Sequence, residues 1–182
     1  IDLENIASLN KSHPARIYLE QSRKISSKIL EHLYYCNNFK EWTNAQKQTF
    51  DDVTNDEPRI IIPLRYKGTL IGFQGRSLLP KSKIKYITIM LEENAPKIYG
   101  LDNINTAKTV YVTEGPFDST FITNSIAMCG ADGDVLKWGI TNPVWIYDNE
   151  PRNRQIVERL SATIDKGDRV CLLYTSDAAD DC

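Results

Sequence analysis

The sequence predicts an α/β protein, in which a parallel sheet with flanking helices follows a smaller α+β part. In the first part, helical patterns precede three β-branched runs, which is typical of α+β organisation. From Lys108 on, short buried runs alternate with helical patterns, which is typical of a parallel sheet. We therefore assign residues 1–107 to a first part and residues 108–170 to a second.

The elements of the first part follow from its apolar spacing. Residues 13–35 predict two short helices, the second capped by Ser26 or Ser27. Residues 43–57 are polar and predict a loop or surface segment. Three strands are expected at 59–64, 69–75 and 84–90. Lys67-Gly68 lies between the first two runs and predicts a hairpin turn.

In the second part, the periodicity predicts strands and helices in alternation. Strands are expected at 110–112, 125–129 and 144–147, with a further strand starting at Arg169. Helical segments are expected at 117–124, 135–138 and 152–164. The last of these is amphipathic, with four apolar residues on one face: Ile156, Val157, Leu160 and Ile164.

Composition sets wide limits. A 41% hydrophobic fraction permits a packed core, and a formal net charge of −2 neither demands nor excludes a nucleic-acid partner. No apolar run approaches the roughly 20 residues of a membrane span, and the start does not resemble a signal peptide. We therefore expect no membrane association.

The C-terminal string needs separate treatment. Cys171 to Asp181 reads CLLYTSDAADD, which resembles the translation of a widely used transposase sequencing adaptor. We expect residues 171–182 to be read-through, with a native acidic tail as the alternative. Without them two cysteines remain, Cys36 and Cys129, whose spacing argues against a zinc site or a disulfide framework.

Acidic residues follow two of the predicted parallel strands. Glu114 comes directly after one strand, Asp148 after another, and Glu150 two residues later. Ligand sites of open parallel sheets gather at the carboxyl ends of the strands, and carboxylate oxygens suit Mg²⁺. Any one of these acids alone is more often a solvated loop residue. Their shared position after buried strands predicts a metal site.

The two sequence motifs that contain these acids resemble motifs of a known domain family. VTEGPFDS and IYDNEPRN resemble the two acidic motifs of Toprim domains, which bind Mg²⁺ and act on phosphodiester bonds. The resemblance implies that Glu114 is the catalytic glutamate, Asp118 the acid of the next helix, and Asp148 the first acid of the DxD motif. Glu150 takes the second DxD position, where the family has Asp. Asp118 also fits a helix N-terminus, where the dipole favours an acid.

The upstream part narrows the resemblance to DNA primases of the bacterial and phage type. RIIIPLRYKGTLIGFQGRSL and KYITIMLEENAPKIYGLDNI resemble the primase segments that precede Toprim, and YDNEPRNRQIV is closest to primases of T-even-type tailed phages. The resemblance implies DNA-templated RNA primer synthesis, with Mg²⁺ or Mn²⁺, a single-stranded DNA template, ribonucleoside triphosphates and a replicative helicase. It places the protein in the cytoplasm of an infected bacterial host, with zinc only in an absent N-terminal module.

Further residues are candidates for nucleotide or nucleic-acid binding. Arg76 follows two glycines and suits a bidentate phosphate contact, and Lys85 and Lys97 suit phosphate neutralisation. The same set includes Arg59, Gly75 and Gly115. Plain alternatives are strand irregularities for the glycines and solvated charges for the basic residues.

Two other functions stay open at this point. A Toprim nuclease or a topoisomerase-like enzyme would use the same metal to cleave DNA, although the GFQGR and YGL motifs disfavour it. An inactive fragment that only binds nucleic acid or a helicase is the third reading. Because the zinc module and the end of the Toprim part are not in this sequence, we expect the chain to be inactive alone.

Overall fold

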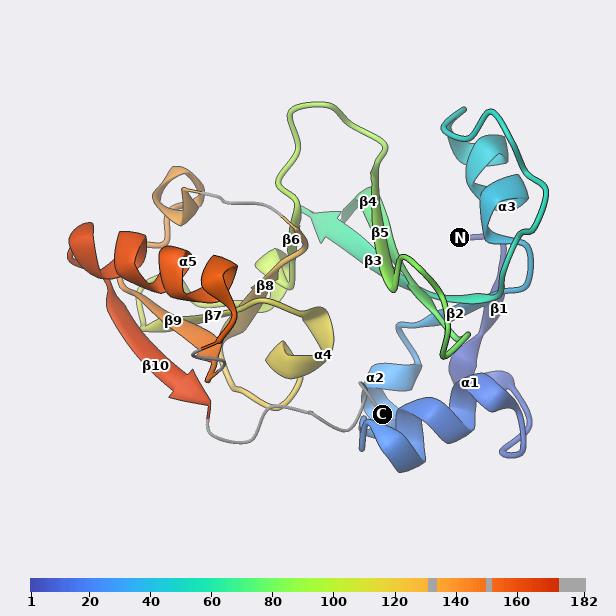
Figure 1. Cartoon of the computed structure of the whole chain (residues 1–182), viewed down its shortest axis with the longest axis horizontal. Coiled ribbons are helices and arrows are strands. Elements are labelled where there is room, and N and C mark those ends of the chain that lie inside the picture. Colours follow the sequence, from blue (N-terminus) through green and yellow to red (C-terminus); the bar gives the residue numbers. More distant parts are fainter. Residues whose placement is uncertain (131–133, 150–151, 174–182) are drawn as a thin grey trace. The chain divides into compact units, whose positions relative to one another are not determined.

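The computed structural model describes residues 1–130, 134–149 and 152–173 (Figure 1). Contacts between Cα atoms divide the chain into two compact units, Ile1–Asp102 and Asn103–Cys182. The first unit is built on an antiparallel sheet and the second on a parallel sheet. This confirms the α/β class, with an α+β part that precedes the parallel part.

The first unit holds a sheet of strand order β1-β2-β3-β4-β5. Neighbouring strands are antiparallel throughout. Its strands are β1 (Glu4–Asn5), β2 (Tyr34–Cys36), β3 (Arg59–Tyr66), β4 (Thr69–Ser77) and β5 (Tyr86–Met90), and β6 (Ile98–Tyr99) follows. Its helical segments are η1 (Ile6–Ser8), α1 (Pro14–Ile17), η2 (Tyr18–Ser22), α2 (Ser27–Leu30), α3 (Phe39–Gln46) and η3 (Leu101–Asn103). The two expected short helices are therefore present.

The predicted hairpin is confirmed at Lys67-Gly68. Strand β3 ends at Tyr66 and β4 begins at Thr69, so the turn has two residues. Both have positive φ, 52° at Lys67 and 76° at Gly68. A two-residue turn of this kind matches the right-handed twist of the strands that it joins.

Helix α3 corrects the expectation of a loop from residue 43. The helix begins at Phe39 and packs on the sheet, with the rings of Phe39 and Trp42 against Phe73 at centroid distances of 6.3 and 4.7 Å. Cys36, Ile61 and Ile89 belong to the same core. The large apolar residues of α3, Phe39 and Trp42, both lie in its first turn. The run from residue 43 on therefore reads as polar, although tertiary contacts stabilise a helix there.

The second unit holds parallel strands in the order β10-β9-β7-β8. These strands are β7 (Val110–Thr113), β8 (Ser125–Met128), β9 (Pro143–Asp148) and β10 (Arg169–Leu173). The helical segments are α4 (Pro116–Ser119), η4 (Val135–Trp138) and α5 (Arg154–Asp165). Helix α5 packs on β9 and β10, and α4 packs on β7 and β8 (Figure 1).

Helix α5 turns a different face to the sheet from the one that its sequence predicts. Ile156 and Thr163 are its buried residues, whereas Val157 and Ile164 are 43% and 56% exposed. The expected apolar face is therefore wrong in its detail. The Thr163 hydroxyl bonds to the Tyr147 hydroxyl of β9, and this contact favours the observed rotation of the helix.

The expected read-through begins inside a strand. Cys171 to Leu173 pair in β10 with Ile146 to Asp148 of β9. Residues 174–182 lie outside the described part of the chain. No helix in the described ranges combines the length and the apolar character that a membrane crossing demands.

Candidate functional site

Two predicted acids lie at one edge of the parallel sheet. In the register of β7 and β9, Val112 lies opposite Trp145. Glu114 follows two residues after Val112, and Asp148 follows three after Trp145 as the last residue of β9. Since the two strands are neighbours and parallel, both acids lie at the carboxyl edge, where ligands of open sheets bind.

The turn after β7 brings a third acid back toward Glu114. Gly115 is the N-cap of α4 and Pro116 its first residue, so Asp118 lies in the first turn. A Cβ atom on Gly115 would lie 2.7 Å from Asp118 Oδ2, so the Asp118 carboxylate occupies the space that a side chain would fill. The buried Thr113 hydroxyl lies 3.1 Å from the carbonyl oxygens of both Gly115 and Ile126, so it links the turn to β8.

Glu114 faces helix α5. Its Oε1 lies 3.8 Å from Arg159 Nη1, and both side chains are partly exposed. A cavity of about 730 Å³ lies between α5 and the sheet and is lined by Glu114, Asp134, Trp145, Arg159 and other residues. This volume falls in the range of small-molecule sites, and its lining carries charges of both signs.

The carboxylate oxygens of this edge are hard donors of the kind that Mg²⁺ prefers. Glu150, the fourth predicted acid, lies outside the described residues. Within the ranges that the structure describes, no three His, Cys, Asp or Glu side chains form a group that could hold a metal ion. The donor chemistry thus fits a divalent cation, while the described acids do not by themselves form a closed metal cage.

Arg76 is held between two tyrosines of the first unit. Its guanidinium carbon lies 5.4 Å from the ring centroid of Tyr18 and 4.8 Å from that of Tyr86, and Nε donates to the Tyr18 hydroxyl at 3.1 Å. Arg76 is 6% exposed, whereas Tyr86 is 37% exposed. The tyrosines fix the orientation of the guanidinium, as a preformed anion contact requires.

Arg59 and Gly75 are engaged within the fold. The Arg59 guanidinium is buried and donates to the carbonyl oxygens of Gly75, Ile84 and Lys85, and it pairs with Glu57. Burial lowers the pKa of Arg59, and Glu57 offsets part of this effect. A Cβ on Gly75 would lie 2.8 Å from Phe39 Cζ. These contacts give both residues a role in packing and loop anchoring, and the nucleic-acid contact expected from the sequence stays a prediction.

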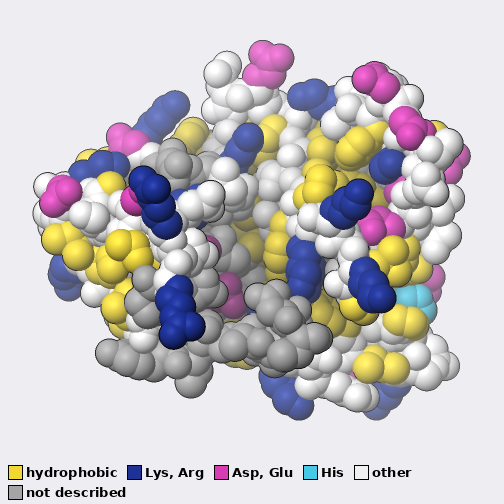
Figure 2. Space-filling view, viewed as in Figure 1, with side chains coloured by type: hydrophobic (Ala, Val, Ile, Leu, Met, Phe, Trp, Pro, Cys, Tyr) yellow, Lys and Arg dark blue, Asp and Glu magenta, His cyan; other side chains and the backbone are white. Residues whose placement is uncertain are grey.

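The remaining basic candidates lie on the surface of the first unit. Lys97 is exposed just before β6, and Lys85 is half-buried just before β5. Figure 2 shows Lys and Arg side chains set among hydrophobic ones on the visible face of this unit.

Three residues of these sites were missed by sequence reasoning. Thr113 holds the turn after β7, Arg159 faces Glu114, and Tyr18 orients Arg76. Arg159 is not one of the apolar residues by which its helix was predicted, and Tyr18 is 58 residues from Arg76 in the chain. Only Thr113, inside the VTEG motif, carried a sequence signal.

Comparison with known proteins identifies relatives of this chain. No protein-family model matches it. The DNA primase of Enterobacteria phage T4 is 34% identical over 164 residues, which cover 89% of this chain and 47% of the phage protein. The chain therefore spans about half the length of the curated relative that it matches.

The solved structures described next, which have a similar fold, are of bacterial primases. The RNA polymerase domain of Mycobacterium tuberculosis primase DnaG has a TM-score of 0.67 at 16% identity, covering 98% of this chain and 74% of that domain chain. A complex of that domain with double-stranded DNA gives a TM-score of 0.65 at 16% identity, with 97% and 70% covered. The zinc-binding and RNA polymerase domains of Aquifex aeolicus primase give 0.62 at 18% identity, with 93% and 52% covered.

Proposed function

We propose that this chain, which is related in sequence to a phage DNA primase and in fold to the RNA polymerase domains of bacterial primases, is part of an enzyme that synthesises RNA primers on a DNA template. Single-stranded DNA and ribonucleoside triphosphates would be its substrates, and a replicative helicase its partner. The proposal places it in phage DNA replication, in the cytoplasm of an infected bacterial host. Zinc would belong to another module, as the two domains named for the Aquifex aeolicus protein suggest.

The observation that carries the proposal is the parallel register of β7 and β9. It puts Glu114 and Asp148 at the same edge of the sheet, although 34 residues separate them in the sequence. Asp118 returns toward the same turn through its contact at Gly115. Carboxylates that gather at the carboxyl edge of a sheet support metal-assisted chemistry on phosphates.

In this proposal Glu114, Asp118 and Asp148 would hold Mg²⁺ or Mn²⁺ together with Glu150. A bound divalent cation would activate the primer hydroxyl and steady the triphosphate for in-line attack. The protein's own contribution is placement: the Thr113 hydroxyl holds the turn that carries Glu114, and Gly115 leaves room for the Asp118 carboxylate. Arg159 offsets the negative charge of Glu114 from the side of α5.

The basic residues of the first unit would bind the polyanions. Arg76, oriented by Tyr18 and Tyr86, would contact a phosphate, and Lys85 and Lys97 would neutralise template or nucleotide charge. Gly115 would serve the acidic site through its contact with Asp118.

Primer synthesis by the full-length gene product tests the proposal. With single-stranded template, ribonucleotides and Mg²⁺, Asp148→Asn and Glu114→Gln should each lower synthesis by at least about a hundredfold, the scale of losing an electrostatic contact to the reacting groups. Asp165→Asn, which removes an exposed acid at the end of α5, is the control and should leave synthesis unchanged. Undiminished synthesis by Asp148→Asn would contradict the proposal. DNA cleavage without RNA synthesis would favour a nuclease.

A further inference from the structure

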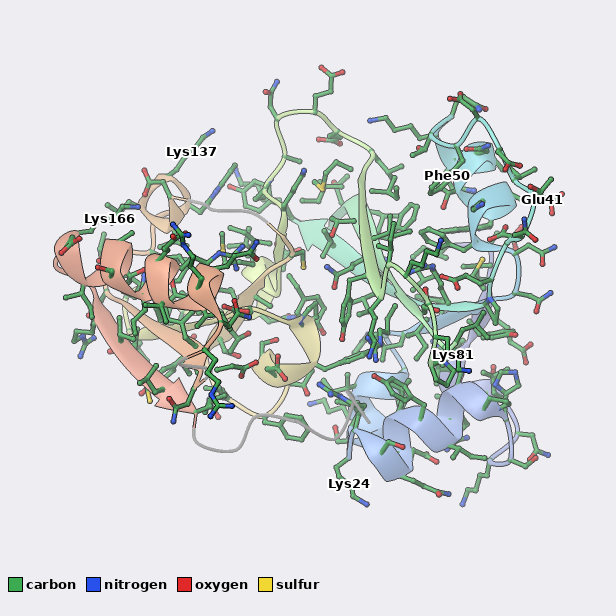
Figure 3. The ribbon with its side chains drawn as sticks, viewed as in Figure 1. Lys24, Glu41, Phe50, Lys81, Lys137 and Lys166 are labelled. Carbon is green, nitrogen blue, oxygen red and sulfur yellow. The ribbon has the colours of Figure 1, made fainter. Side chains whose placement is uncertain are left out.

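The loop between β4 and β5 carries a cluster of positive charge. Residues 78–85 read LLPKSKIK, with three lysines and no acid. Lys81, labelled in Figure 3, and Lys83 are exposed, and Lys85 is half-buried. Ile84 is 58% exposed and Leu79 46% exposed, so apolar side chains alternate with the charges. The loop thus presents both a polyanion contact and an apolar one.

The buried guanidinium of Arg59 anchors the backbone of this loop. Arg59 Nη2 donates to the Ile84 carbonyl oxygen at 2.8 Å, and Nη1 donates to the Lys85 carbonyl oxygen at 3.2 Å. Arg59 is 3% exposed and pairs with Glu57. Burying a charge is unfavourable unless hydrogen bonds and a counter-charge satisfy it, and this guanidinium has both. The Arg59 guanidinium therefore fixes the backbone of the loop through these two hydrogen bonds.

Further hydrogen bonds fix the start of the loop at Leu79 and its middle at Ser82. The Ser82 hydroxyl donates to Glu57 Oε1 at 2.8 Å and lies 3.2 Å from the Ile84 carbonyl oxygen. The Leu79 amide donates to Ser77 Oγ at 3.1 Å. Because the backbone is fixed at several points, less conformational entropy is lost when its side chains bind a partner.

We propose that this anchored loop, residues 78–85, binds the phosphate backbone of single-stranded nucleic acid through Lys81 and Lys83, with Arg59 as its positioning residue. The lysines neutralise phosphates, and exposed Leu79 and Ile84 offer apolar contact to unpaired bases, which a duplex keeps stacked inside. The loop leads directly into Tyr86, whose partly exposed ring offers a stacking surface. This inference rests on the proposed function, because it concerns the template that a primase reads.

Binding of a labelled oligothymidylate to the 182-residue chain, followed by fluorescence anisotropy at several salt concentrations, tests the lysines. The double variant Lys81→Gln/Lys83→Gln should bind roughly fivefold to tenfold more weakly, and its slope of log affinity against log salt should be shallower by about 1.4, or about 0.7 for each lost contact. The control Lys11→Gln/Lys28→Gln removes two exposed lysines of the same unit and the same charge. Equal losses in both double variants would overturn the proposal. Stronger dependence of duplex binding on the two lysines would overturn the assignment to single strands.

Two further variants test the anchoring. Ser82→Ala should weaken oligothymidylate binding about threefold, with little change in Tm, and should have no further effect in the Lys81→Gln/Lys83→Gln background. Arg59→Lys keeps the charge but loses the planar fork, so it should weaken binding in the same way. If Arg59→Lys does not fold, Ser82→Ala decides the question. Equal effects of Ser82→Ala with and without the two lysines would overturn the positioning role.

These outcomes are separable from those of the proposed function. Binding of oligothymidylate to the loop needs no metal, so the weaker binding of Lys81→Gln/Lys83→Gln should persist in EDTA, whereas primer synthesis should stop. Loss of primer synthesis in Asp148→Asn with unchanged binding in Lys81→Gln/Lys83→Gln would support the function and contradict the loop. Unchanged primer synthesis in Asp148→Asn with weaker binding in Lys81→Gln/Lys83→Gln would support the loop and contradict the function.

Discussion

The hydroxyl groups of Tyr147 and Thr163 lie 2.8 Å apart and join β9 to helix α5. Both side chains are buried, and the Thr163 hydroxyl also lies 2.9 Å from the Arg159 carbonyl oxygen. The same helix carries Arg159 toward Glu114. The position of one side of the acidic site therefore depends on this buried contact.

We expect Thr163→Val to lower the free energy of unfolding by about 1–2 kcal/mol, because it removes a buried hydrogen bond while it keeps the side-chain shape. Urea unfolding would measure the loss. Tyr147→Phe should cost a similar amount, and the double variant should cost less than both losses together, because each change removes the same bond. Strict additivity of the two losses would show that the hydroxyls act independently.

Gly115→Ala should weaken the binding of Mn²⁺ by roughly tenfold, because the new methyl group would displace the Asp118 carboxylate from its place 2.7 Å away. Titration of the chain with Mn²⁺, followed by electron paramagnetic resonance, would measure the affinity. In an Asp118→Asn background the glycine change should have a much smaller effect. An equal effect in both backgrounds would mean that Gly115 does not act through Asp118.

Gly75→Ala should lower the free energy of unfolding by about 1–3 kcal/mol, the usual cost of overpacking a core. The added methyl would lie 2.8 Å from Phe39 Cζ and 3.1 Å from Arg59 Cδ. Thermal unfolding followed by circular dichroism would report the loss. Since Phe39→Leu would make room, the glycine substitution should cost less in that background, and an unchanged cost would contradict this packing account.

Alkaline pH should destabilise the fold in part through Cys36. Burial raises the pKa of its thiol to about 12, so the thiol stays protonated in the fold while the unfolded chain releases the proton above about pH 9. The unfolded state then binds fewer protons, and the free energy of unfolding falls as the pH rises from about 9 toward 12, by at most about 1.4 kcal/mol per pH unit for one proton.

Urea unfolding of the unsubstituted chain and of Cys36→Ala across this pH range measures the effect. The variant should begin from a somewhat lower stability, because a buried side chain is truncated, and should then lose stability less steeply with pH. Parallel pH profiles would show that Cys36 does not titrate as expected.

Local patterns in the sequence determined much of this protein. The Lys67-Gly68 turn was predictable because a two-residue turn with positive φ depends on the residues of the turn itself. Strands β7 and β9 were predictable because each is a short, largely apolar run that ends at a polar residue. Their acids fell at one edge for a topological reason, since parallel strands present their carboxyl ends together. The comparisons confirm the resemblance to phage and bacterial primases that the motif order indicated.

Only the tertiary structure decided which charged side chains are exposed and what they contact. Arg59 begins β3 and Arg76 is the next-to-last residue of β4, yet one guanidinium anchors a loop and the other lies between two tyrosines. Helix α5 turns Thr163 rather than Ile164 to the sheet, because the Tyr147 hydroxyl offers a buried partner there. Periodicity records where apolar residues lie along a chain, whereas these contacts join residues far apart in sequence, and their energies depend on geometry that exists only once the chain has folded.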